Sequence, residues 1–101
     1  MKRWEIYWAD VRFEDTSETK IRPIVIVNET MAFVVGFGVY SASPRPMTTD
    51  FVIQDWKQAG LDHQSTIRTD RLVRIDKSDV HEKIGELSRK DSMLLALYND
   101  L

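Results

Sequence analysis

No cysteine occurs among the 101 residues of this chain. Its absence excludes disulfide bonds, thiolate nucleophiles and zinc–thiolate sites, and it is compatible with a reducing compartment. No apolar run approaches the roughly 20 residues that a membrane-spanning helix requires, and residues 1–5 are not followed by the apolar segment of a signal peptide. We therefore expect a cytoplasmic protein that does not enter a membrane.

The chain also lacks an excess of positive charge, because 14 lysines and arginines stand against 16 aspartates and glutamates, for a net charge of −2. Overall basicity therefore gives no indication of nucleic-acid binding, although phosphate contacts depend on where the cations lie rather than on their sum. The two histidines, His63 and His81, are isolated from each other and from any carboxylate cluster with ligand spacing. We expect no metal site and no cofactor.

The most informative stretch that is present covers residues 20–28, Lys-Ile-Arg-Pro-Ile-Val-Ile-Val-Asn. Its β-branched residues predict a strand that starts at Pro23 and is buried on both faces. The next apolar run, residues 33–41, follows after a few turn-forming residues, so the two runs should form an antiparallel hairpin. Arg22 then lies opposite the end of the second run, within roughly 5 to 8 Å. A guanidinium and the Ser41 hydroxyl are therefore expected together at one end of a sheet.

Apolar patterning predicts five or so strands in all, joined by short turns. Gly36 and Gly38 fall on one face of their strand, which indicates a bend or the close approach of another backbone. The sequence therefore predicts one mainly β domain over residues 1–101, a small and strongly bent antiparallel barrel with α appendages. The expected strands cover residues 4–11, 23–28, 33–41, 51–53 and 65–76, the last of them bent near Thr69 and Asp70.

The remaining segments are expected to be helical or irregular. Residues 12–20 are polar and predict a loop, and residues 54–59 predict a short helix closed by Gly60. A C-terminal helix should open at Ser88, with Asp91 completing a variant of the capping box. The apolar stripe of that helix, expected to face the core or a dimer partner, consists of Leu94, Leu97, Tyr98 and Leu101.

Further cations accompany Arg22. Arg45 is held between two prolines in the loop after Ser41, and a restricted cation loses less entropy when it binds an anion. The last predicted strand carries a basic stripe that neighbouring aspartates can neutralise in surface ion pairs. This stripe consists of Arg68, Arg71 and Arg74.

Taken together, these residues make the sequence similar to the MazF/PemK family of toxin endoribonucleases from type II toxin–antitoxin pairs. Trp4-Glu5 stands where that family usually has Gly-Asp. The matching stretches, in the family's order, are Ile-Tyr-Trp-Ala-Asp at 6–10, Ser-Glu at 17–18, Arg-Pro-Ile-Val-Ile-Val-Asn at 22–28, Val-Tyr-Ser-Ala-Ser at 39–43, residues 60–65, Arg-Ile-Asp-Lys at 74–77 and Lys-Ile-Gly-Glu-Leu-Ser at 83–88.

The resemblance implies an SH3-like barrel of the CcdB/MazF type with a C-terminal helix, usually a homodimer, that cleaves single-stranded RNA without a metal. It also implies that a cognate antitoxin peptide occupies the same surface. The family's active-site arginine falls on Arg22, its loop glutamate on Glu18 and its catalytic threonine on Ser41. On this basis the expected RNA-binding residues are Lys20, Ser43, Arg45, Arg68 and Arg71.

Metal-free cleavage by the RNA 2′-hydroxyl requires a base, charge stabilisation at phosphorus and a donor for the leaving oxygen. Arg22 is permanently charged and can bind two phosphate oxygens, so it suits charge stabilisation. The sequence indicates no histidine near Ser41, which we expect to hydrogen-bond the phosphate, and Glu18 is the candidate base. On spacing alone, Arg22 would instead be a strand-edge cation paired with Glu18 or Asp15.

Other functions remain open on the same fold, because one barrel hosts several activities. The chain could be a catalytically inactive relative or a plain interaction module. It could also be a gyrase-directed toxin like CcdB, which would act through its C-terminal helix. RNA cleavage in EDTA, lost on Arg22→Ala, would separate the nuclease from these alternatives.

Overall fold

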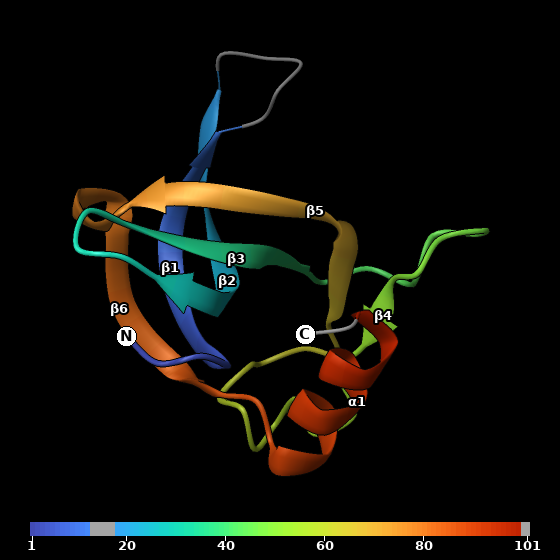
Figure 1. The fold of residues 1–101 in the computed structure, drawn as a ribbon. Coiled ribbons are helices and arrows are strands. Elements are labelled where there is room, and N and C mark those ends of the chain that lie inside the picture. Colours follow the sequence, from blue (N-terminus) through green and yellow to red (C-terminus); the bar gives the residue numbers. More distant parts are fainter. Residues whose placement is uncertain (13–17, 100–101) are drawn as a thin grey trace.

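The computed structural model describes residues 1–12 and 18–99, in which six strands form one antiparallel sheet that bends around a core (Figure 1). The mainly β fold with a C-terminal helix is as predicted. The strands follow one another across the sheet in the order β4-β5-β3-β2-β1-β6. The elements are β1 (Glu5–Arg12), β2 (Thr19–Glu29), β3 (Phe33–Tyr40), β4 (Phe51–Val52), β5 (Thr66–Asp76), a 3-10 turn (Lys77–Asp79), β6 (Val80–Glu86) and α1 (Arg89–Asn99).

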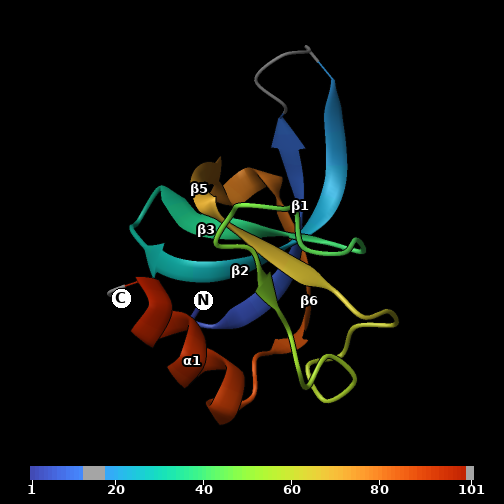
Figure 2. The same cartoon turned by 90° about the vertical axis from the view of Figure 1, so that its right-hand side faces the viewer.

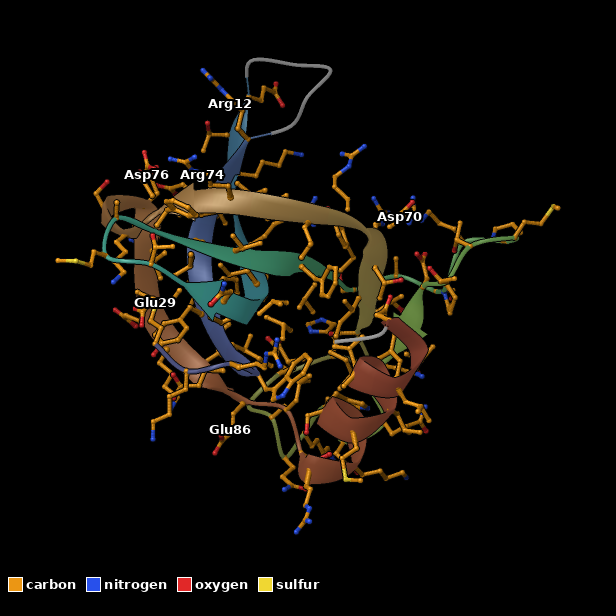
Figure 3. All side chains as sticks on the ribbon, in the orientation of Figure 1. Arg12, Glu29, Asp70, Arg74, Asp76 and Glu86 are labelled. Carbon is orange, nitrogen blue, oxygen red and sulfur yellow. The ribbon has the colours of Figure 1, made fainter. Side chains whose placement is uncertain are left out.

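The sheet curves because one of its longest strands is bulged. Between the pairs Val39↔Ile67 and Phe37↔Leu72, four residues of β5 face one of β3. Figure 3 shows Asp70 at the corner that results, as predicted for this part of the strand. Gly36 permits the close approach that its position suggested, since a Cβ there would lie 2.3 Å from the Val25 carbonyl oxygen.

β2 is longer than predicted, because it begins at Thr19 rather than at Pro23. Its pairing with β1 continues back to Thr19, whereas its pairing with β3 starts only at Ile24. Pro23 therefore occupies an edge-like position, which tolerates a residue without an N–H. The predicted loop 12–20 shrinks accordingly, and its residues 13–17 lie outside the described part of the chain.

β6 was not among the predicted strands; it pairs with β1 and covers the edge that β1 would otherwise present (Figure 2). Backbone geometry is unusual just before β1, where Trp4 has a φ of 76°. Its N–H donates to the Ile26 carbonyl at 2.7 Å, and its carbonyl accepts from the Leu87 N–H at 2.9 Å. These bonds hold a tryptophan in the left-handed region that normally favours glycine.

The C-terminal helix is capped as predicted but buries a different side. The Asp91 N–H donates to the Ser88 Oγ at 3.1 Å, which completes the N-cap. Leu95 is fully buried in the core, whereas the predicted stripe residue Leu97 is 76% exposed. Leu97 therefore does not pack in the core, since packing as well as periodicity selects the buried side, and a dimer surface at Leu97 stays a prediction. Leu101 and the side chain of Tyr98 lie outside what the structure describes.

Residues 54–59 form successive hydrogen-bonded turns instead of the predicted short helix. The Gly60 cap is nevertheless present: the Gly60 N–H donates to the Lys57 carbonyl and the Leu61 N–H to the Trp56 carbonyl, both at 3.0 Å. This is the Schellman pattern, and Gly60 has the positive φ of 92° that it requires. The cap turns the chain toward the open ends of β2 and β3.

Candidate active site

A cavity of about 650 Å³ lies where β2 begins and β3 gives way to the loop after it. Its wall combines cations, two serine hydroxyls, a carboxylate and an imidazole with apolar side chains, which is the composition expected of a binding site. We refer to it as the Arg22 pocket. It is lined by Trp8, Lys20, Ile21, Arg22, Pro23, Val39, Ser41, Gly60, Leu61, Asp62, His63, Ser65 and Ile84.

Arg22 reaches this pocket because of the strand register. Ile24 pairs with Gly38, so Arg22, two residues earlier, falls across from Tyr40. Its guanidinium carbon lies 4.4 Å from the centroid of the Tyr40 ring. Ser41 follows Tyr40 and lines the same pocket. The structure thus brings Arg22 and Ser41 together at one end of the sheet, where the hairpin register was expected to put them.

The wall contributed by β1 and β2 is aromatic and basic. Trp8 pairs with Pro23 and remains 40% exposed, which is high for a tryptophan in a central strand. Lys20 is exposed on the same wall, beside Ile21, which is 63% exposed. An exposed indole and a cation that line the same cavity offer a stacking surface for a base and a charge for a phosphate.

The pocket also contains two residues that the sequence analysis missed, Asp62 and His63. The His63 Nδ1 lies 2.9 Å from Asp62 Oδ1, and this hydrogen bond holds the pKa of the Asp62 carboxyl below its usual range. In the sequence, His63 is isolated and lies 22 positions from Ser41. Only the Gly60 cap, which redirects the chain, could have indicated that this histidine approaches the strand ends.

Glu18 and Ser43 lie less centrally than expected. Glu18 is exposed, directly precedes β2 and is not among the described residues that line the Arg22 pocket. Ser43 lines a neighbouring hollow of about 200 Å³, to which Ser41 also contributes. Serine hydroxyl groups therefore lie both in the Arg22 pocket and farther along the loop after β3.

Arg45, an expected RNA-binding residue, is bound within the protein. Its Nε and Nη2 donate to the two Asp50 carboxylate oxygens at 2.8 and 2.7 Å, and Nη2 also donates to Asp70 Oδ1 at 2.9 Å. The hydrogen bonds from Arg45 hold the pKa of Asp50, whose side chain is only 1% exposed, well below its usual range. We refer to these three residues as the Arg45 corner, and their geometry assigns Arg45 a structural role.

The arginines of β5 are separated by its bulge. The Arg68 guanidinium carbon lies 3.8 Å from the Tyr40 centroid, so this ring receives one arginine from β2 and another from β5. Arg71 is exposed, and it lines with Arg68 a small hollow of about 50 Å³ next to Tyr40. Arg74 instead stacks 3.9 Å from the centroid of Phe33, at the far end of β5.

No group of three potential metal-binding His, Cys, Asp or Glu side chains occurs among residues 1–12 and 18–99. His81, which the sequence presented as isolated, lies 3.1 Å from Asp10 through its Nε2. That pair belongs to β6 and β1, and His81 does not line the Arg22 pocket. In the same described residues, no helix is both long and apolar enough to cross a bilayer.

The comparisons with known proteins identify the class. Residues 2–96 match the family described as PemK-like, MazF-like toxin of type II toxin-antitoxin system, and the chain belongs to this family. Its structure is similar to that of the Mycobacterium tuberculosis toxin MazF-mt6, with a TM-score of 0.69 and 18% identity over 92% of this chain and 91% of that one. At this identity the likeness establishes the MazF fold alone. No curated protein matches the sequence. Membership of a type II toxin family implies an antitoxin partner.

Proposed function

We propose that this protein is the toxin of a type II pair and acts as a metal-independent endoribonuclease on single-stranded RNA. The observation that carries this proposal is the meeting of Arg22 and Ser41 in one open pocket of about 650 Å³. Family membership supports it. An RNA substrate implies that the protein acts in the cytoplasm.

The reaction is attack of a ribose 2′-oxygen on the adjacent phosphorus, with departure of the 5′-oxygen of the next nucleotide. Negative charge accumulates on the phosphate oxygens as the five-coordinate transition state forms. Arg22 can bind two of these oxygens and remains charged at any working pH. Ser41 donates a hydrogen bond to the same phosphate. Stacking on Tyr40 orients the Arg22 guanidinium, because a ring face holds a cation without cancelling its charge.

The rest of the pocket binds the RNA strand. A base unstacked from its neighbours can lie against Trp8, and Lys20 contacts the backbone phosphate beside it. Ser43 extends the path along the loop after β3, whereas Arg68 and Arg71 extend it past Tyr40. Recognition of this kind requires unpaired bases, since a base within a duplex has no free face to offer.

The test is cleavage of a long single-stranded RNA by the purified protein in EDTA. Discrete cuts with 2′,3′-cyclic phosphate and 5′-hydroxyl ends are expected. They should disappear with Arg22→Ala and when the nucleotide 5′ of the cut carries a 2′-deoxy sugar. Cuts that persist in Arg22→Ala would show a contaminating nuclease. Absence of cuts with retained RNA binding would identify an inactive binding module instead.

The antitoxin and a second copy of the chain are the proposed protein partners. An extended antitoxin peptide with acidic side chains would compete with RNA for Lys20 and Arg22. A dimer would use the exposed side of α1, where Met93 is 61% and Leu97 76% exposed beside a largely apolar cavity of about 550 Å³. Sedimentation of the wild type and Leu97→Glu checks this surface, since the charged variant should shift toward monomer.

A further inference from the structure

We propose that His63 is the general acid of this site and protonates the 5′-oxygen that leaves phosphorus. The inference rests on the proposed nuclease function and adds to it the group that Arg22 and Ser41 do not supply. Arg22 cannot exchange its proton, because a guanidinium stays charged in a protein. Among the described residues that line the Arg22 pocket, the imidazole is the side chain suited to proton transfer near neutral pH.

The local structure fixes how the imidazole is presented. His63 Nδ1 donates to Asp62 Oδ1 at 2.9 Å, so the proton that the imidazolium can transfer to a substrate is the one on Nε2. The Ser65 Oγ donates to the His63 carbonyl at 2.9 Å, so the backbone is held as well. The Gly60 cap determines the direction in which the chain enters this segment. His63 itself is exposed, so a bound RNA can reach it.

Charged side chains from two segments line the pocket together with His63. Lys20 and Arg22 line it from β2, and Asp62 lines it from the segment that follows the Gly60 cap. The wall also has uncharged parts, which are formed by Trp8 of β1, Val39 of β3 and Ile84 of β6. Asp62 is a positioning residue, because its hydrogen bond with Nδ1 orients the His63 ring.

The step balances as follows. The 2′-oxygen forms its bond to phosphorus and releases its proton to solvent water, which acts as the base. The P–O5′ bond breaks, and the proton on Nε2 passes to O5′ to give the 5′-hydroxyl product. The neutral imidazole then takes up from water the proton that the 2′-hydroxyl released, which restores the imidazolium. General acid catalysis of this kind contributes about 10²- to 10⁴-fold to a rate, and an alkoxide leaving group needs it most.

The experiment uses His81 as a matched control, because both histidines pair with an aspartate, at 2.9 and 3.1 Å, but His81 lies outside the pocket. Single-turnover rates are measured for the wild type, His63→Gln and His81→Gln. Two RNA oligonucleotides are compared: the ordinary one, and one in which sulfur replaces the bridging 5′-oxygen at the cut. A thiolate leaves without protonation, so the second substrate does not need a general acid.

We expect His63→Gln to slow cleavage of the ordinary RNA by about 10²-fold or more, and to match the wild type on the sulfur-bridged RNA. His81→Gln should match the wild type on both. Equal slowing of both substrates by His63→Gln would overturn the assignment, and so would no slowing of either. If the wild type cuts neither RNA, the proposed nuclease function is wrong. If the wild type cuts and Arg22→Ala does not, the nuclease function holds and the result for His63→Gln decides only the role of His63.

Discussion

The Arg22 pocket and the Arg45 corner each present an arginine near the same end of the sheet, and they use it in different ways. Arg45 is held by two carboxylates at 2.7 to 2.9 Å, one of them almost fully buried. Arg22 is held against the ring of Tyr40 and faces a cavity that also contains Ser41 and Lys20. A guanidinium locked between carboxylates stabilises the fold, whereas one stacked on a ring beside a cavity is arranged to meet a phosphate.

The largest expected effect concerns the hydroxyl in the Arg22 pocket. Ser41→Ala should lower the single-turnover rate of RNA cleavage by about 10² to 10³, because one preorganised donor to the transition state is lost. Ser41→Thr should keep most of the activity, since Ser41 is exposed and an added methyl group has room. Equal rates for Ser41→Ala and the wild type would remove Ser41 from the chemistry.

The Arg45 corner should respond in stability rather than in rate. Arg45→Ala removes the cation that pairs with Asp50, so the free energy of unfolding in urea should fall by about 2 kcal/mol. Arg45→Lys should recover part of this loss, because a lysine keeps the charge but not the fork that binds both oxygens. An unchanged urea midpoint in Arg45→Ala would contradict the structural role.

These two regions also show what the sequence could and could not predict. Strand period and turn length were enough to place Arg22 near Ser41, because antiparallel register follows from a short hairpin. The sequence could not predict that Arg45 meets Asp70, 25 positions away, since that contact depends on the bulge of β5. The sequence also did not indicate that His63 lies in the Arg22 pocket, because a single capped turn determines the position of this histidine.

The helix gives a further example. Its start was predictable from Ser88 and Asp91, which act through local hydrogen bonds. Its buried side was not, because Leu95 and Leu97 are equally apolar and only the surrounding core distinguishes them. Local chemistry can therefore be read from sequence, whereas contacts between distant segments depend on the bends of the sheet.

A smaller effect is expected at Tyr40, which contacts Arg22 without touching the phosphate. Tyr40→Leu should reduce the cleavage rate by about 10-fold, since Arg22 loses a cation–π contact of roughly 1 kcal/mol and its fixed orientation. Tyr40→Phe retains the ring and should cleave at nearly the wild-type rate. Loss of activity in both variants to the same extent would point to the hydroxyl instead and contradict a role through stacking.

The smallest effect concerns the ion pair between Glu5 and Lys83, neither of which lines the Arg22 pocket or belongs to the Arg45 corner. Hydrogen bonds from Lys83 and from the Lys2 N–H lower the pKa of Glu5 from 4.5 to about 2. Because the pKa is lowered on folding, this stabilisation is present above about pH 5 and is lost as the pH falls toward 2. Glu5→Gln should cost on the order of 1 kcal/mol at pH 7, since Lys83 is half exposed, and less at pH 3. Urea unfolding at both pH values checks this; an equal loss at both would contradict it.

The most direct test of the account compares Arg22→Ala with Arg45→Ala in one cleavage assay, with rates expressed per folded molecule. We expect Arg22→Ala to lose at least about 10²-fold in single-turnover rate with a smaller fall in urea midpoint than Arg45→Ala, and Arg45→Ala to cleave nearly as fast as the wild type while unfolding at lower urea. The opposite pattern, with Arg45 needed for cleavage and Arg22 only for stability, would contradict the assignment of the active site.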